Sequence, residues 1–182
     1  GIVWLNGNGN DAPTPMGLAA ADMFAGHFLV QGLVAAMFKV LKTGEGSHVQ
    51  TSLMEAILDF QFEVLTTYLN NGRRKPKRSN YNNAHAYLAA PYGIYKTSDG
   101  YIAISMTPVP KLGELINLES IQKYTDQKEW FTKRDEIKEL IGNLIVTKTT
   151  QHWLDILQPA DAWCSEVLEW DKMMEHEGFK VI

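Results

Sequence analysis

The sequence predicts an α+β fold, in which a helical segment precedes a small domain with an antiparallel hairpin and further helices. Two patterns lead to this prediction. Apolar residues fill positions 18–41 at helical spacing, and two short alternating runs flank Asp99-Gly100, a dipeptide typical of tight hairpins. A basic stretch broken by proline, 73–78, separates the two patterns. We therefore expect a large-domain segment over 1–72, a linker over 73–86, a small α+β domain over 87–160 and a return segment over 161–182.

The elements follow from local signals along the chain. Residues 1–16 contain Asn-Gly turn signals and two prolines, and predict a loop. The first long helix, in which Ala25, Gly32 and Ala36 share a face that allows close packing, should end at Gly44 and Gly46. Further elements are expected as a short strand over 49–53, a helix over 54–70, hairpin strands over 91–96 and 101–105, and helices near 109–118, 130–144 and 150–157.

Composition indicates an ordered domain. The chain has 182 residues, 45% of them hydrophobic and 21% charged, and its net charge of −4 argues against nucleic acid as a partner. The single cysteine, Cys164, rules out an internal disulfide and suits a cytoplasmic location. The apolar run over 28–37 is interrupted by Gln31 and Gly32 and is short for a bilayer, so we expect a buried core helix and no membrane partner.

Asp22, at the head of the long helix, has two interpretations. As a structural residue it would favour the positive end of the helix dipole. As a nucleophile it would use the same helix N–H groups to hold a developing oxyanion, with Gly26 one turn later leaving space above the carboxylate. Glu55, in the first turn of a later helix, is better explained by helix capping. The five histidines never approach metal-ligand spacing, and we predict no metal.

A wider pattern favours the nucleophile. The spacing Gly17-x4-Asp22-x3-Gly26, then Thr43-Gly-x-Gly46 and Ser52-Leu53-x-Glu55, resembles the family III CoA-transferases. The resemblance continues through 90–104, 134–137 and 160–167. It implies an α/β family fold, a catalytic role for Asp22, CoA supplied as an acyl-CoA substrate, a carboxylic acid as the second substrate, and an interlocked homodimer. We also assign Gly26 and Leu53 to substrate or CoA binding.

The family mechanism implied by this resemblance passes CoA through the aspartate. The carboxylate forms a mixed anhydride with the acyl group and then an aspartyl-CoA thioester, so neither ATP nor a metal is required. Family members are roughly twice as long and begin with a Rossmann-like half that supplies most contacts to the CoA adenine and phosphates. We therefore expect this chain to be a C-terminal portion of such a protein, inactive by itself.

Two alternatives and one motif stay open. The chain could be part of a 2-methylacyl-CoA racemase or epimerase, although a glutamate-proline pair of those relatives is replaced here by Ser105-Met-Thr-Pro. It could also be a non-catalytic dimerisation fragment. The basic run 73–78 predicts a solvated tether, with capture of a CoA phosphate as the functional alternative and a nucleic-acid patch disfavoured by the overall charge.

Overall fold

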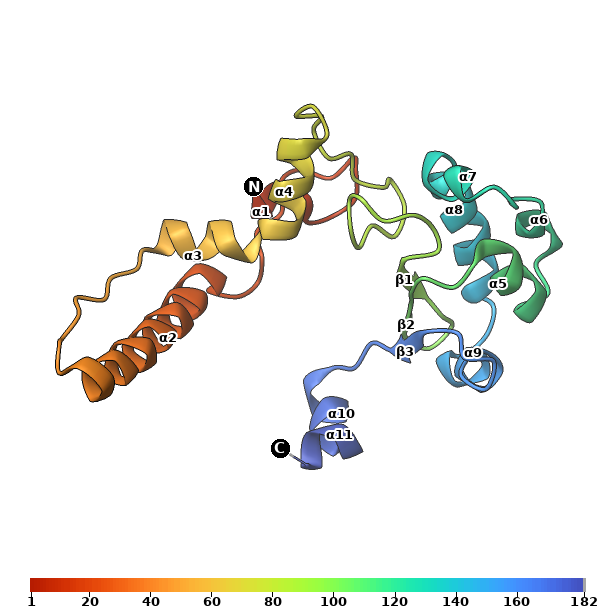
Figure 1. The fold of residues 1–182 in the computed structure, drawn as a ribbon. Helices are drawn as coiled ribbons and strands as arrows, with labels where there is room; N and C mark the ends of the chain where they lie inside the picture. The colour runs from red at the N-terminus through yellow and green to blue at the C-terminus, as the bar shows by residue number, and fades with distance from the viewer. Residues whose placement is uncertain (182) are drawn as a thin grey trace. The chain divides into compact units, whose positions relative to one another are not determined.

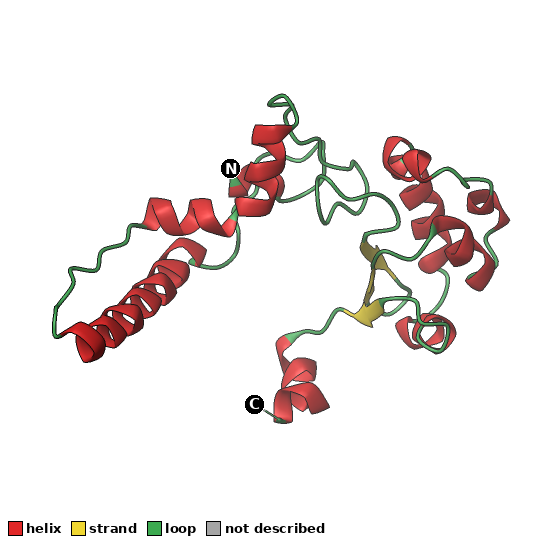
Figure 2. Cartoon of the chain, in the orientation of Figure 1, coloured by secondary structure: helices red, strands yellow, loops and turns green. Residues whose placement is uncertain are grey.

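The computed structural model describes residues 1–181, which form two compact units (Figure 1). The first unit comprises residues 1–6 and 11–76, and the second comprises residues 7–10 together with the chain from Lys77 onward. Helices predominate, and the strands all lie in the second unit (Figure 2). The predicted α+β class is confirmed.

The first unit is built from four helices. They are α1 (Ile2–Leu5), α2 (Ala20–Thr43), α3 (Leu53–Phe60) and α4 (Phe62–Asn70). The predicted long helix is present as α2, and it ends at Gly44, whose φ of 73° lies in the left-handed region that glycine adopts without steric cost. The expectation of a loop over 1–16 was wrong at α1, a single turn that the turn signals nearby conceal.

The segment after α2 returns along this helix. A Cβ built on Gly32 would lie 2.5 Å from Cγ1 of Val49, so the missing side chain lets the segment approach α2 closely. Residues 49–52 do not form the predicted strand, because they pack on a helix instead of pairing with another strand. The predicted use of Gly32 for close packing is confirmed.

The predicted helix over 54–70 is two helices. α3 begins at the N-cap Ser52, whose Oγ accepts from Glu55 N at 3.2 Å and donates to Glu55 Oε2 at 2.8 Å. The capping role expected of Glu55 is therefore confirmed. Gln61 separates α3 from α4, and its Nε2 donates to Ile57 O at 2.7 Å. The polar Gln61 side chain caps the preceding turn, and helical periodicity alone does not reveal such a break.

The second unit has a three-stranded antiparallel sheet in the order β1-β2-β3. β1 (Gly93–Lys96) and β2 (Tyr101–Ile104) form the predicted hairpin, with Tyr95 opposite Ile102. β3 (Cys164–Glu166) pairs with β2, an addition that the sequence analysis missed because three residues carry no readable alternation.

Helices cover one face of this sheet and enclose the core. They are α5 (Val109–Leu115), α6 (Glu119–Gln122), α7 (Gln127–Thr132), α8 (Arg134–Ile145) and α9 (Thr150–Leu157). α10 (Trp170–Glu175) and α11 (Glu177–Lys180) follow β3 and contain no buried residue. The core joins the inward side chains of the sheet to one face of α8, and its fully buried members include Tyr95, Ile102, Ile137, Ile141 and Ile145. The predicted helix near 109–118 is α5, which ends three residues earlier, and the predicted helix near 130–144 is divided into α7 and α8.

Residues 77–86 pack on the start of α8. Arg134 Nη1 donates to Ala86 O at 2.7 Å, Asp135 Oδ1 accepts from Ser79 Oγ at 2.6 Å, and Lys138 Nζ donates to Asn82 O at 3.1 Å. Lys138 is fully buried, and burial lowers its pKa to about 8. Residues 77–86 are therefore packed, whereas in the basic run 73–78, predicted to be a solvated tether, only Arg78 is buried. The linker and domain boundaries proposed from the sequence remain predictions.

α2 differs most from the sequence expectation. We predicted a buried core helix, but its apolar side chains are largely exposed, including Val34 at 62% and Phe38 at 59%. The run was also judged too short for a bilayer, yet the 24-residue helix that contains it is long and apolar enough to cross a membrane by length and composition alone. A single helix of this kind is weak evidence for a membrane span, because core helices of globular proteins share both properties.

Candidate active site

Asp22 lies in the first turn of α2 and is exposed. Ala19 occupies the N-cap position and makes no side-chain cap, so Asp22 does not serve as the N-cap residue. Within residues 1–181 its carboxylate has no recorded hydrogen bond or ion pair. The helix dipole and the orphan N–H groups of this first turn favour negative charge here. The carboxylate is thus available to an incoming molecule.

Gly26 stands one turn after Asp22 on the same helix. A Cβ built on Gly26 would meet no heavy atom within 4 Å, in contrast to Gly32 further along the helix. The space beside Asp22 is therefore open in the described chain. The structure leaves room above the carboxylate, while the roles of Asp22 and Gly26 in catalysis remain predictions.

Leu53, the third predicted site residue, begins α3 and is 52% exposed. The other end of α3 meets the start of α2, because the rings of Phe24 and Phe60 stack with centroids 4.3 Å apart. Leu53 precedes Phe60 by seven residues, about 10 Å along a helix. The contact next to Asp22 thus comes from Phe60, and a direct part for Leu53 in this site stays a prediction.

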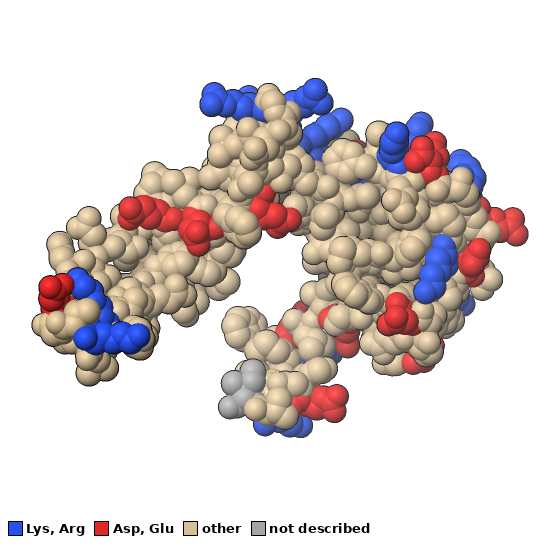
Figure 3. All heavy atoms as spheres, viewed as in Figure 1, with Lys and Arg blue, Asp and Glu red and all other residues tan. Residues whose placement is uncertain are grey.

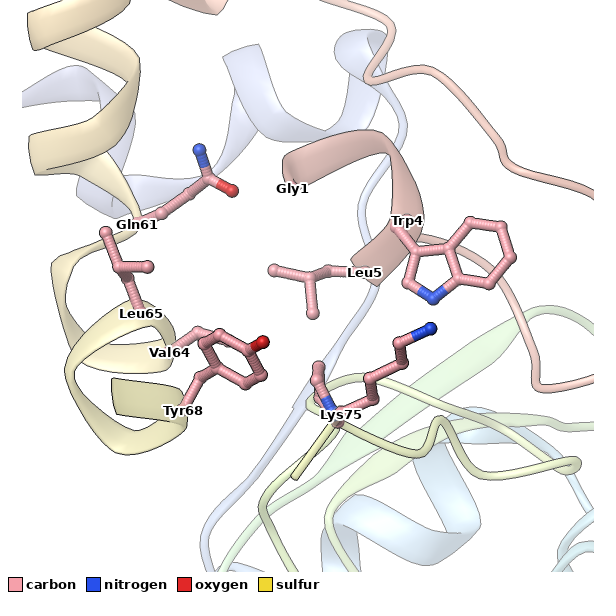
Figure 4. Close-up of a pocket in the computed structure, with 9 residues that line it drawn as sticks. Gly1, Trp4, Leu5, Gln61, Val64, Leu65, Tyr68 and Lys75 are labelled. Atoms are coloured by element: carbon pink, nitrogen blue, oxygen red, sulfur yellow. The ribbon is translucent and has the colours of Figure 1, made fainter. Parts of the chain in front are cut away.

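A pocket of ≈ 460 Å³ opens in the first unit between α1 and α4. Figure 4 shows Leu5 of α1 pointing toward Val64 and Tyr68 of α4, with Gln61 at one end and Lys75 at the other. Trp4 and Leu65 also line the pocket. Gln61 directly follows Phe60, so this pocket begins where α3 ends. The sequence analysis did not find this pocket, because its walls come from a short helix and from a helix face that carries no motif. The basic run that contains Lys75 was the one sequence signal that pointed to this part of the chain.

Charge is distributed unevenly around these features. Lys and Arg atoms gather at the end of α4 (Figure 3), where Arg73, Arg74 and Lys75 are exposed. The described residues hold no group of three His, Cys, Asp or Glu side chains that could bind a metal. The arrangement offers a free carboxylate, an apolar pocket and a cluster of cations, one of which, Lys75, lines that pocket.

Comparison with known proteins identifies the family. The family model described as CoA-transferase family III matches residues 1–181. The chain belongs to CoA-transferase family III.

Relatives of this family III chain are named as CoA-transferases. A succinate–glutarate CoA-transferase from Agrobacterium fabrum is 29% identical over 155 residues, which cover 82% of this chain and 37% of the relative. A human succinyl-CoA:glutarate CoA-transferase is 24% identical over 87% of this chain and 36% of its own length. The chain thus spans little more than a third of these relatives.

Solved structures show the same fold. The Rv3272 protein of Mycobacterium tuberculosis, in an orthorhombic crystal form, matches with a TM-score of 0.76 at 22% identity, over 100% of this chain and 48% of that protein. A CAIB/BAIF family protein from Brucella suis matches with a TM-score of 0.77 at 22% identity, over 99% of this chain and 48% of its own. The family III fold predicted from the sequence is confirmed.

Proposed function

We propose that this chain provides the catalytic carboxylate of a CoA-transferase that moves CoA between an acyl-CoA and a carboxylic acid. The exposed Asp22 carboxylate at the start of α2, with open space at Gly26, carries the proposal. Family membership and the transferase names of the relatives support the reaction class.

The chemistry balances without a further reagent. Asp22 attacks the thioester carbonyl carbon and the C–S bond breaks. CoA thiolate departs, and the acyl group is now joined to Asp22 as a mixed anhydride. The thiolate then attacks the aspartyl carbonyl and releases the first acid. The acceptor carboxylate repeats these steps in reverse order, takes CoA away and restores Asp22. Helix N–H groups suit the oxyanions, because they offer donors that have no partner within α2.

Dicarboxylic acids are the substrate class that the relatives favour. The proteins from Agrobacterium fabrum and human are both named for succinate or succinyl-CoA and glutarate. A racemase is the second candidate function, but the glutamate-proline pair of racemase relatives is replaced in this chain by Ser105-Met-Thr-Pro, and the relatives described above are named as transferases. We therefore rank transfer above racemisation.

Steady-state kinetics test this proposal in the protein that carries the chain. With succinyl-CoA and glutarate, Asp22→Asn should abolish transfer while leaving the fold unchanged, because the amide keeps the shape and loses the nucleophile. Asp59→Asn is the matched control, since Asp59 is another exposed acid of the same unit, on α3. Wild-type turnover in Asp22→Asn, or equal loss in Asp59→Asn, would contradict the assignment.

We further propose a homodimer, because the exposed apolar residues of α2 need a covering surface. A cytoplasmic location also remains our proposal. Light scattering of the chain should give the mass of a dimer, and the double variant Val34→Glu, Phe38→Glu should reduce it to that of a monomer. A monomeric wild type would contradict the dimer and would leave α2 to a different partner.

A further inference from the structure

The basic turn after α4, residues 71–75, is held in a defined shape. Asn71 Oδ1 accepts from Arg74 N at 2.8 Å, and Arg73 N donates to Tyr68 O at 3.1 Å. Gly72 and Arg73 are both left-handed, with φ of 77° and 57°. A non-glycine residue rarely adopts this conformation, so the surrounding bonds must hold it there. The turn therefore presents its cations from a fixed backbone.

These cations have no local acid to neutralise them. Arg73, Arg74 and Lys75 are exposed, and over residues 1–181 the structure records no carboxylate paired with them. Three like charges on consecutive residues repel one another in a chain whose net charge is −4. An anionic ligand would relieve this repulsion, and phosphate oxygens accept well from guanidinium and ammonium groups.

The turn lies at one end of the pocket and the Asp22 end of α2 lies toward the other. Lys75 lines the pocket at the end where Tyr68 lies, and Gln61 lines its opposite end. α4 connects these ends and is about 13 Å long. Gln61 follows Phe60, which stacks on Phe24, two residues after Asp22. A ligand that spans both ends would be long. Its anionic group would lie at the Lys75 end, and its reactive group at the Gln61 end, toward Asp22.

We propose that the basic turn binds a phosphate group of the CoA thioester, whose pantetheine arm crosses the pocket between α1 and α4 toward Asp22. This inference rests on the proposed function for the identity of the ligand. The basic turn would contact CoA in addition to the CoA contacts that other parts of the protein supply. The apolar walls of Leu5, Val64 and Leu65 suit the arm, and Gln61 Oε1 can accept from its amides while Nε2 stays bonded to Ile57 O.

Binding calorimetry of the protein that carries this chain tests the inference with CoA, dephospho-CoA and phosphate-free pantetheine as probes. The variant Arg74→Gln, Lys75→Gln should bind CoA about tenfold more weakly, the combined effect expected of two exposed ion pairs. Arg73 stays unchanged because its left-handed backbone tolerates few substitutions. The matched control is Lys128→Gln, Lys148→Gln, two exposed cations of the second unit, and should bind as the wild type does.

Pantetheine separates phosphate recognition from damage to the pocket, because its affinity should be the same in wild type and variant. A loss that disappears with dephospho-CoA assigns the 3′-phosphate to the turn, and one that persists assigns the pyrophosphate. Unchanged CoA affinity in the variant, or an equal loss with pantetheine, would overturn the inference. Calorimetry needs no turnover, so failure of Asp22 as a nucleophile leaves this test readable.

Discussion

The two units use apolar residues in opposite ways. In α8 of the second unit, five of the twelve residues are buried, and three isoleucines among them join the core beneath the sheet. In α2 of the first unit, which the structure describes throughout, Ala20 alone of 24 residues is buried. The second unit thus encloses a core of its own, whereas α2 presents apolar surface that another protein surface must cover to be stable in water.

The largest expected effect comes from the core of the second unit. Ile141→Ala removes buried methyl groups and leaves a cavity, and should lower the free energy of unfolding by about 2–5 kcal/mol. Val34→Ala on α2 removes a side chain that is exposed within one chain, so in protein diluted until it is monomeric it should change this free energy by less than about 0.5 kcal/mol. Denaturant unfolding followed by far-UV circular dichroism measures both. Similar losses at the two positions would mean that α2 is covered in solution.

The second effect concerns the buried Lys138, which faces Arg134 and Asp135. Burial disfavours its charged form and lowers its pKa to about 8, against 10.5 for an unperturbed lysine. Above about pH 8 the folded state releases this proton before the unfolded state does. Stability should therefore rise with pH, by about 2 kcal/mol between about pH 8 and about pH 9.5.

Lys138→Met is the control for this pH dependence, because it removes the titrating group and should flatten the rise. Burial also raises the pKa of Tyr95. This shift lowers the free energy of unfolding only near pH 10 and above, where tyrosine ionises in the unfolded chain, so it lies above the range from about pH 8 to about pH 9.5. The measurement is denaturant unfolding across this range. An equal rise in Lys138→Met would assign the pH dependence to other groups.

The smallest effect separates two glycines of α2. Gly26→Ala should stabilise the helix by about 1 kcal/mol, since alanine is the better helix former and nothing lies near the new Cβ. Gly32→Ala should gain little or lose stability, because its Cβ would meet Val49 at 2.5 Å. Gly26→Leu should lower transferase activity while keeping this stability. Thermal unfolding compares the three variants, and equal gains at both positions would contradict the packing described at Gly32.

The fold could be predicted where local signals are strong. The helix ending at Gly44, the Asp99-Gly100 hairpin and the place of Glu55 in the first turn of a helix all follow from backbone and side-chain chemistry within a few residues. β3 could not be predicted, because its pairing with β2 joins residues about sixty positions apart. Exposure of α2 could not be predicted either, since periodicity reports which residues are apolar and not what covers them.

The candidate site was predicted unevenly. Asp22 and Gly26 stand together on α2 because their spacing matches one helical turn, a relation that the sequence itself contains. The pocket depends on α1 packing against α4, a contact between residues some sixty positions apart that no local pattern announces. Likewise, the run 73–78 indicated only positive charge. The hydrogen bond from Arg74 N to Asn71 Oδ1 that shapes its turn is visible only in the three-dimensional structure.

The central claim is that Asp22 carries CoA. Mass spectrometry of the protein that contains this chain, quenched during turnover with succinyl-CoA, tests it most directly. The account predicts a CoA thioester on the peptide containing Asp22, absent from Asp22→Asn and lost when glutarate is added. Turnover without this adduct, or with the adduct on another carboxylate such as Asp59, would contradict the account.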